Sequence, residues 1–287
     1  MSVICLFPGQ GSQVKGMGGD LFDRYDDWTI TADTILDYSI KELCLDDPRS
    51  ELGRTEFTQP ALFVVNAMTY RARLEDGRES ATIVAGHSLG EYNALAAAGV
   101  FDFETGVQLV RRRGEIMSKV TGGGMAAVIG LNRAAIENVL AQSDAGRRLD
   151  VANFNSFDQT VIAGPQADLA SVKSDFQNAG VRAYVPLNVS APFHSRYMKA
   201  AQDEFAKELD ATRFYPPVIS VIANVTGRPH DGDAARVRQT LAQQIGHSVR
   251  WLDTMLYLLD QPEPQFEEVG PGNVLTKLLA QIRKMRQ

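Results

Sequence analysis

Residues 86–90 of this chain, GHSLG, follow the spacing G-x-S-x-G, which is typical of a serine nucleophile. A short apolar run, residues 83–85, precedes them, and a helix-forming run, residues 91–98, follows. Glycine on both sides lets the backbone form a strained turn that exposes the oxygen of Ser88, and the next helix aims its free N–H groups there. The alternative is a serine that only caps this helix. The context favours the nucleophile, but the turn alone does not identify the acyl acceptor.

A serine nucleophile needs a base, and the sequence offers four histidines. His194, in NVSAPFHSRYM, is the best candidate, because strand-end loops of this kind hold the sites of parallel α/β sheets. His87 neighbours the nucleophile, so its ring is expected to point away from it. His230, in the polar loop RPHDGDA, is expected to be solvated. His247 is kept as a second candidate, and a purely structural role is the alternative for His194.

The glycine-rich stretch FPGQGSQ, residues 7–13, directly follows the first apolar run. Gly9 and Gly11 allow another segment to approach the backbone closely, so an N–H near Gln10 is a candidate donor to an oxyanion at Ser88. The alternative is a plain connection between a strand and a helix. The motif alone leaves both interpretations open.

Arg113 lies on a predicted helix over residues 103–120. At about 100° per residue, four apolar side chains fall within about 60° of Arg113, namely Leu109, Val110, Ile116 and Met117. Arg113 is therefore predicted to lie in a buried stripe, whereas Arg111 and Arg112 point away from it. A buried guanidinium is costly unless an anion pairs with it, and its fork geometry suits a carboxylate. That carboxylate belongs either to a buried Asp or Glu or to a substrate, and the residues leave this choice open.

The composition narrows the class of protein. The chain has 287 residues, long enough for a large core and a further subdomain. Its net charge of −6 argues against nucleic acid as a partner. We expect no membrane span, because the sequence has no apolar run of about 18 residues, and no metal site, because no Cys/His cluster has ligand spacing. Cys5 and Cys44 lie in apolar surroundings, which is typical of reduced cytoplasmic proteins.

The hydrophobic pattern predicts the fold class. Strands are expected at residues 3–7 and 82–85, and helices at 60–75, opened by Pro60, at 91–99 and at 103–120. Further core strands are expected within 216–225 and 266–272. Alternating strands and helices of this kind indicate an α/β protein with a mainly parallel sheet covered by helices.

The pattern changes after the three glycines at 122–124. Strands are expected at 125–131, 150–154, 159–164 and 182–188, and helices at 133–143 and 166–180. This β-α-β-β-α-β order is that of a ferredoxin-like unit. We therefore expect a large α/β-hydrolase-like subdomain, residues 1–123 and 188–287, with a ferredoxin-like small subdomain, residues 124–187, inserted into it.

Seven motifs together carry a resemblance to a known family. They are FPGQGSQ at 7–13, TQPAL at 58–62, GHSLGEY at 86–92, LVRRRG at 109–114, GGMAAVIGL at 123–131, SAPFHS at 190–195 and EVGPG at 268–272. In this order and over essentially the whole chain, they resemble the malonyl-CoA:acyl carrier protein transacylases. The stretches FTQPALFVVNAMTY and GVFDFETGVQLVRRRGEIM look most like the discrete acyltransferases that serve modular polyketide synthases in trans, as in the disorazole type.

The resemblance implies a role for each candidate residue. Ser88 corresponds to the acylated nucleophile and His194 to its base. The N–H groups of Gln10 and Leu89 correspond to the oxyanion hole, and Arg113 to the arginine that binds the malonyl carboxylate.

Two further positions follow from the same resemblance. Gln244 corresponds to a residue whose main-chain carbonyl orients the histidine ring, so no acidic third member is expected. Phe193 matches the pattern associated with malonyl rather than methylmalonyl units, because its ring narrows the space for an α-methyl branch.

The implied activity is a malonyl transfer from malonyl-CoA, through a malonyl-serine, to the phosphopantetheine thiol of an acyl carrier protein. No tightly bound cofactor is expected, since the partner carries the phosphopantetheine. The alternatives are the malonyltransferase of fatty acid synthesis, an acyl hydrolase that edits carrier proteins, and a scaffold without activity. The oligomeric state stays open, with a monomer as the working expectation. A basic C-terminal run is a candidate patch for an acidic carrier protein, or merely a helix end; it contains Lys277, Arg283, Lys284 and Arg286.

Overall fold

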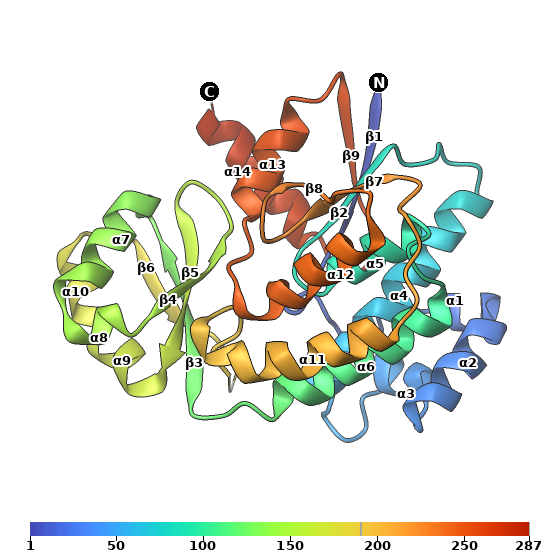
Figure 1. The fold of residues 1–287 in the computed structure, drawn as a ribbon, viewed down its shortest axis with the longest axis horizontal. Coiled ribbons are helices and arrows are strands. Elements are labelled where there is room, and N and C mark those ends of the chain that lie inside the picture. The colour runs from blue at the N-terminus through green and yellow to red at the C-terminus, as the bar shows by residue number, and fades with distance from the viewer. Residues whose placement is uncertain (190, 287) are drawn as a thin grey trace.

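The computed structural model describes residues 1–189 and 191–286, so Ser190 of the SAPFHS motif and Gln287 lie outside the described residues. Its larger sheet has five strands in the order β8-β7-β2-β1-β9, and only the β7–β8 pair is antiparallel (Figure 1). The bounds are β1 Ser2–Phe7, β2 Ile83–Gly86, β7 Ser220–Ala223, β8 Arg228–Pro229 and β9 Pro264–Glu268. The predicted mainly parallel sheet is confirmed, although β7 covers only part of the expected 216–225.

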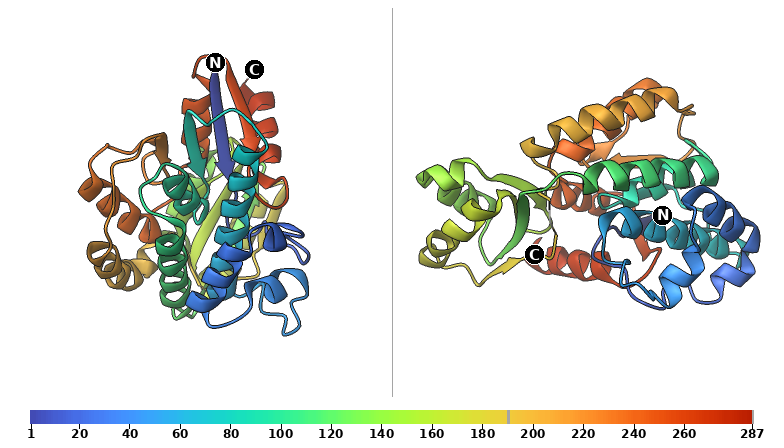
Figure 2. Two further views of the ribbon diagram at one scale, coloured as in Figure 1. Left: turned by 90° about the vertical axis from the view of Figure 1, so that its right-hand side faces the viewer. Right: turned by 90° about the horizontal axis from the view of Figure 1, so that it is seen from below.

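Helices cover both faces of this sheet (Figure 2). Alternate residues of β1 enter two separate cores: Cys5 and Phe7 join one, and Ile4 and Leu6 join the other. The first core is completed by α4 Thr55–Glu75, α5 Gly90–Ala97 and α6 Phe103–Ser118, and the second by α13 Trp251–Leu259 and α14 Val274–Arg286. The continuous apolar run of β1 is therefore explained by burial on both sides.

Further helices complete the larger part of the molecule. They are α1 Leu21–Arg24, α2 Asp26–Leu36, α3 Ile40–Leu45, α11 Lys199–Ala211 and α12 Ala234–Gln243, with single turns η1 Arg196–Met198 and η2 Gln244–Gly246. None of the helices in the described part of the chain has the length and apolar character needed to cross a membrane.

The start of α4 differs from the prediction. The helix begins at Thr55, so Pro60 lies inside it rather than opening it. The Thr58 hydroxyl donates to the carbonyls of Leu52 and Arg54, at 2.6 and 2.9 Å, and so supports the early turn in a segment that looks polar and irregular in sequence. Pro60 lacks the N–H that would bond one turn back.

A second sheet forms the separate lobe on the left of Figure 1, with strand order β4-β5-β3-β6 and only antiparallel pairs. Its strands are β3 Gly123–Ile129, β4 Asp150–Phe154, β5 Gln159–Pro165 and β6 Ala183–Pro186. Its helices are α7 Arg133–Gln142, α8 Asp144–Arg147, α9 Gln166–Ser171 and α10 Lys173–Asn178. The predicted β-α-β-β-α-β order is confirmed, but the single helix expected at 166–180 is broken at Val172 into α9 and α10.

Candidate active site

The turn that holds Ser88 lies between β2 and α5, at the carboxyl end of a central strand of the larger sheet. Ser88 has a positive φ of 50°, a left-handed conformation that is uncommon for a residue with a side chain. The turn is tight: a Cβ on Gly86 would lie 1.9 Å from the carbonyl carbon of Gly90. Only glycine fits there, which explains the spacing around Ser88.

The FPGQG loop packs directly against this turn. A Cβ on Gly9 would lie 2.2 Å from the carbonyl oxygen of His87, and a Cβ on Gly90 would lie 2.0 Å from that of Phe7. The Asn66 side-chain amide, on α4, donates to the carbonyl of Pro8 at 3.0 Å and fixes the loop. The two segments can touch only because both carry glycine.

Gln10 and Leu89 border the resulting pocket, and each has a backbone N–H. Both residues line the same cavity as Ser88. Within the described part of the chain, neither N–H donates to a protein acceptor. Free N–H groups beside a candidate nucleophile are what an oxyanion hole requires.

Ser88 and His194 are brought together from segments 106 residues apart. Ser88 Oγ lies 2.8 Å from His194 Nε2, and His194 Nδ1 lies 2.8 Å from the main-chain carbonyl oxygen of Gln244. A carbonyl can only accept, so Nδ1 carries the proton and Nε2 is free to accept the Ser88 proton. His194 also has a positive φ, 57°.

The environment keeps the His194 ring neutral. Burial, reinforced by the positive charge of Arg113, lowers the pKa of His194 to about 3. The ring is 4% exposed in the free protein. It is therefore a neutral proton acceptor at physiological pH.

Arg113 lies in the apolar stripe of α6, as predicted, and is 1% exposed. Its guanidinium donates to the side-chain oxygens of Gln59 and Gln244, each at 2.8 Å, and lies 3.3 Å from Ser88 Oγ. No ion pair to Arg113 occurs among the residues that the structure describes. Burial lowers the pKa of Arg113, and Tyr92 and Glu91 oppose this shift. Of the two partners that the sequence left open, a protein carboxylate directly paired with Arg113 is therefore not found among residues 1–189 and 191–286.

The cavity around these groups has a volume of about 110 Å³. Its walls combine Ser88, His194 and Arg113 with apolar side chains, among them Met117, Met125, Leu187 and Phe193. Phe193 is 6% exposed. The small volume and the single cation suit a short acid group.

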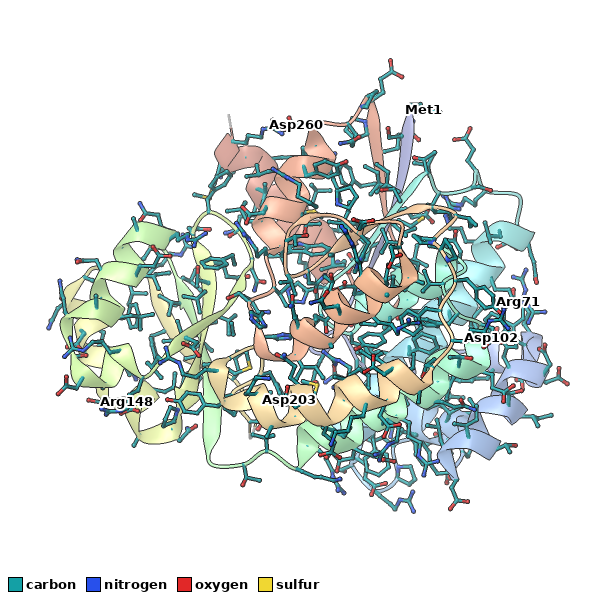
Figure 3. All side chains as sticks on the ribbon, in the orientation of Figure 1. Met1, Arg71, Asp102, Arg148, Asp203 and Asp260 are labelled. Carbon is teal, nitrogen blue, oxygen red and sulfur yellow. The ribbon has the colours of Figure 1, made fainter. Side chains whose placement is uncertain are left out.

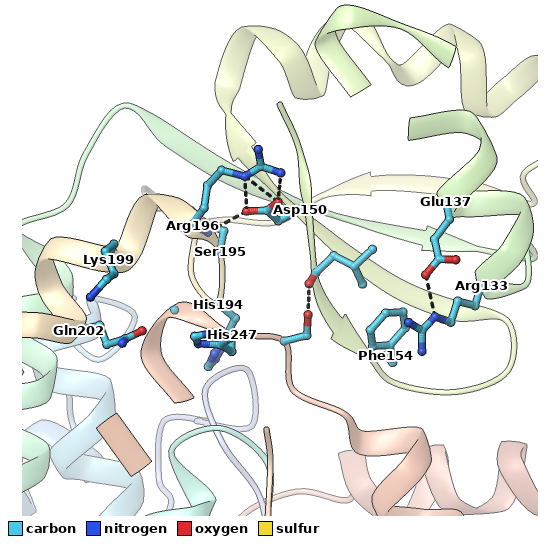
Figure 4. A pocket seen from close by; sticks show the side chains of 13 residues that line it. Arg133, Glu137, Asp150, Phe154, His194, Ser195, Arg196, Lys199, Gln202 and His247 are labelled. Carbon is cyan, nitrogen blue, oxygen red and sulfur yellow. Dashed lines mark hydrogen bonds and ion pairs between the residues drawn. The ribbon is translucent and has the colours of Figure 1, made fainter. Parts of the chain in front are cut away.

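A larger cavity of about 570 Å³ borders the other side of His194, between the two sheets (Figure 4). Arg196, the first residue of η1, lines it and donates through Nε to Asp150 of β4 at 2.9 Å. Arg133, Lys199 and His247 also line it. His194 thus lies between the small cavity at Ser88 and a cleft that is lined by the larger part of the molecule and by the lobe around the second sheet.

The structure decides among the other histidines. His87 points away from Ser88, as expected, and its Nε2 contacts the Asn155 side-chain oxygen at 2.9 Å. His247 is exposed and contacts the carbonyl of Gln243 rather than Ser88. The expectation for His230 is wrong: its side chain is 1% exposed and lies 2.8 Å from the buried Glu91 carboxylate. Its polar neighbours in sequence face solvent while its own ring turns inward.

Sequence reasoning missed several residues that hold the site. Asn224 accepts from the Ser88 N–H at 2.7 Å and donates to the Gly86 carbonyl at 2.7 Å, which braces the turn. Gln59 accepts a hydrogen bond from Arg113, and Glu91 accepts one from the side-chain amide of Gln244. For Gln59 and Glu91, a buried polar position inside a helical pattern is the available signal, as for Arg113. No cluster of His, Cys, Asp and Glu able to hold a metal occurs in the described residues.

Comparisons with known proteins agree with this geometry. Residues 4–284 match the acyl transferase domain family. The chain is 51% identical over 280 residues to the polyketide biosynthesis malonyl CoA-acyl carrier protein transacylase PksC of Bacillus subtilis, covering 97% of this chain and 96% of PksC. It is 41% identical over 285 residues to the malonyl CoA-acyl carrier protein transacylase of Synechocystis, covering 97% and 92%.

Solved structures give the same result. A malonyl CoA-acyl carrier protein transacylase from Burkholderia pseudomallei aligns with a TM-score of 0.95 and 50% identity, covering 99% of this chain and 98% of that one. A malonyl-transacylase in complex with its type II polyketide synthase acyl-carrier protein aligns with a TM-score of 0.94 and 35% identity, covering 99% and 94%. The chain therefore belongs to the acyl transferase family, and its resemblance to the malonyl-CoA:acyl carrier protein transacylases is confirmed.

Proposed function

We propose that this protein transfers malonyl groups from malonyl-CoA to the phosphopantetheine thiol of an acyl carrier protein, through a malonyl ester on Ser88. The observation that carries the proposal is the buried Arg113. It reaches within 3.3 Å of Ser88 Oγ, and no carboxylate pairs with it in the described residues. A malonyl thioester supplies both the carbonyl that Ser88 attacks and the carboxylate that Arg113 lacks.

The first half-reaction follows from the hydrogen bonds. His194 Nε2 takes the Ser88 proton as Oγ bonds to the thioester carbonyl carbon. The N–H groups of Gln10 and Leu89 donate to the tetrahedral oxyanion, each donor contributing about 3 kcal/mol to transition-state stabilisation. The C–S bond breaks, and His194 returns its proton to the CoA sulfur. In this scheme Gln244 acts through its main-chain carbonyl, which holds the His194 tautomer.

The second half-reaction is the same sequence with a different thiol. The carrier's phosphopantetheine thiol gives its proton to His194 and attacks the malonyl ester, and Ser88 Oγ recovers the proton on leaving. Arg113 holds the carboxylate throughout both halves. A pocket that keeps a cation for this purpose discriminates against acetyl, because acetyl leaves the cation unpaired.

We propose that each sheet belongs to its own subdomain: residues 1–123 and 188–287 form the one with the larger sheet, and residues 124–187 form the one with the second sheet. The second sheet has a core of its own beneath its helices, which includes Ile136, Leu169 and Phe176, and this supports the division. Ala152, Val161 and Ala163 of the same sheet join the core of the larger part. The carrier's arm and CoA would enter through the cleft between the two subdomains.

The basic C-terminal end of α14 is poorly sited for docking. Arg286 pairs with Asp260, which lies at the top of Figure 3, as does Met1 at the amino end of β1. Ser88 follows the carboxyl end of β2, which runs parallel to β1. A helix end is the better interpretation of that run.

We infer service to a polyketide synthase in trans, with fatty acid synthesis as the alternative. Higher identity to PksC than to the Synechocystis transacylase supports the polyketide role. A cytoplasmic location is proposed on the two free, buried cysteines, which suit a reducing compartment.

Intact-protein mass spectrometry tests the activity. The protein is incubated with malonyl-CoA and a holo acyl carrier protein, with Ser88→Ala as the control. Malonyl on the carrier, and a malonyl adduct on the protein that Ser88→Ala lacks, are the expected results. Free malonate with an unloaded carrier would instead identify an editing hydrolase, and absence of any adduct would identify a scaffold. Loading the carriers of a polyketide synthase in preference to the fatty acid carrier would support the polyketide role.

A further inference from the structure

A fully buried carboxylate lies beneath the Ser88 turn and has no part in the proton and acyl transfers. Glu91, on the first turn of α5, is 0% exposed. One carboxylate oxygen lies 2.8 Å from His230 Nε2. The other accepts from the Gln244 side-chain amide at 2.7 Å and from the Asn224 N–H at 3.1 Å. An ionised carboxylate can only accept, and all three of these groups can donate to it.

Gln244 links this carboxylate to the reacting groups. Its side-chain oxygen accepts from Arg113 at 2.8 Å, and its side-chain nitrogen donates to Glu91 and to the Ser88 carbonyl, the latter at 2.8 Å. Its main-chain carbonyl holds His194. One residue therefore contacts all three groups of the site.

The amide of Gln244 has two orientations, and its neighbours choose between them. A guanidinium can only donate and a carboxylate can only accept. With Glu91 on one side and Arg113 on the other, the amide must turn its nitrogen to Glu91 and its oxygen to Arg113. The reversed amide would set donor against donor at Arg113 and acceptor against acceptor at Glu91.

His230 fixes the other end of the chain of contacts. Its ring is buried, and its Nδ1 has no hydrogen-bond partner among the described residues. Since Glu91 can only accept, the proton of the ring lies on Nε2 and points to the carboxylate. The contacts then run without interruption from His230 through Glu91 and Gln244 to Arg113.

We propose that Glu91, held by His230, is a positioning residue that locks the Gln244 amide and thereby aims Arg113 at the substrate carboxylate. The negative charge of Glu91 also offsets the buried Arg113 cation while no substrate is bound. This role rests on the proposed function, because it concerns how Arg113 meets an acyl carboxylate. It needs no contact between Glu91 and the substrate.

The test is a double-variant cycle with Glu91→Gln and Gln244→Met. Glu91→Gln keeps the shape but offers one acceptor oxygen to three donors, and Gln244→Met removes the side-chain link while keeping the main-chain carbonyl. Each single variant is expected to lower kcat/KM for malonyl-CoA by about tenfold to a hundredfold and to change acetyl-CoA transfer less, since a misplacement of about 1 Å can cost about a hundredfold in rate. The double variant should lose no more than Gln244→Met alone.

Glu115→Gln is the matched control, because Glu115 is a half-buried carboxylate on α6 that pairs with Arg111 and Arg112. It should keep the malonyl-to-acetyl ratio of the unmodified protein. Equal losses for both acyl groups in Glu91→Gln, or additive losses in the double variant, would show that Glu91 has only a structural role.

Crystal structures separate this proposal from the proposed function. If the unmodified protein loads no carrier, the transfer function fails, but the position of Arg113 can still be compared between the unmodified protein and Glu91→Gln. A displaced Arg113 guanidinium would support the positioning role. Superimposable Arg113 side chains would overturn it, whatever the activity.

Discussion

The role of Arg113 is most sharply tested by Arg113→Met, which removes the charge but keeps much of the side-chain volume. Arg113 is buried, and its described partners are the neutral amides of Gln59 and Gln244 and the Ser88 hydroxyl. The free protein therefore carries a buried cation without a directly paired anion. A substrate carboxylate would supply the missing partner.

The magnitude for malonyl follows from that burial. Removing one member of a buried, hydrogen-bonded charge pair costs about 2–5 kcal/mol. At about 1.4 kcal/mol per factor of ten, kcat/KM for malonyl-CoA should fall between about 30-fold and about 5,000-fold. Acetyl-CoA has no acyl carboxylate for Arg113 to bind, so acetyl transfer by Arg113→Met should be unchanged or faster.

Stability separates a substrate-binding arginine from a structural one. Arg113→Met relieves the burial of a charge but leaves the two glutamine oxygens without a donor, and these effects oppose each other. We expect the free energy of unfolding to change by less than about 2 kcal/mol. If Arg113 instead belonged to a buried ion pair needed for folding, the loss would be about 3–5 kcal/mol.

The assay measures loading of a holo carrier protein from malonyl-CoA and from acetyl-CoA, together with urea unfolding. Arg112→Met is the control, because Arg112 is the next residue on α6 but is partly exposed and pairs with Glu208 at 2.9 Å. It should retain the selectivity of the unmodified protein. An unchanged malonyl-to-acetyl ratio in Arg113→Met would refute the assignment of Arg113 to the substrate carboxylate.

Three further outcomes are expected. Because the pKa of His194 is about 3 in the folded protein and near 6.5 when unfolded, stability is lost as pH falls through this window. Urea unfolding measures how much the free energy of unfolding falls between pH 7 and pH 4.5, and this fall should be about 2.5 kcal/mol smaller in His194→Gln than in the unmodified protein. An equal fall in both proteins would contradict the low pKa of His194. Gly9→Ala should abolish carrier loading, because its Cβ would lie 2.2 Å from the His87 carbonyl oxygen. Gly53→Ala is the control and should keep carrier loading, because the space around Gly53 is open. Full activity of Gly9→Ala would rule out the close approach of the two loops. Phe193→Val should raise the methylmalonyl-to-malonyl ratio about tenfold in competition assays, and an unchanged ratio would remove Phe193 from acyl selectivity.

The parts of the site that could be predicted are those with a local signature. Glycines around Ser88 indicate a tight turn, and the helical period of α6 predicts that Arg113 is buried, which the 1% exposure confirms. The β-α-β-β-α-β order of the second sheet follows from hydrophobic period alone. These features depend on neighbours within a few residues, so sequence patterns contain them.

The parts that could not be predicted depend on contacts between distant segments. His230 has polar neighbours, yet its ring is buried because the partner that draws it inward, Glu91, lies 139 residues away. The bracing of the Ser88 turn by Asn224 joins positions 136 residues apart. An asparagine near a strand end has many common roles, and nothing in its local sequence selects this one.

The contact that holds His194 shows why one class of site residue escapes sequence reasoning from chemistry. The acceptor for Nδ1 is a main-chain carbonyl, which every residue has, so the type of residue 244 carries no information about that bond. The side chain of Gln244 does carry information, because its amide accepts from Arg113 and donates to Glu91 at once, which an apolar or purely accepting side chain could not do. Gln244 therefore serves the site in two ways: its main-chain carbonyl holds His194, and its side-chain amide bonds to Arg113 and Glu91. A variant that alters only the side chain, such as Gln244→Met, separates the two, and we expect it to impair malonyl selectivity while leaving the His194 ring in place.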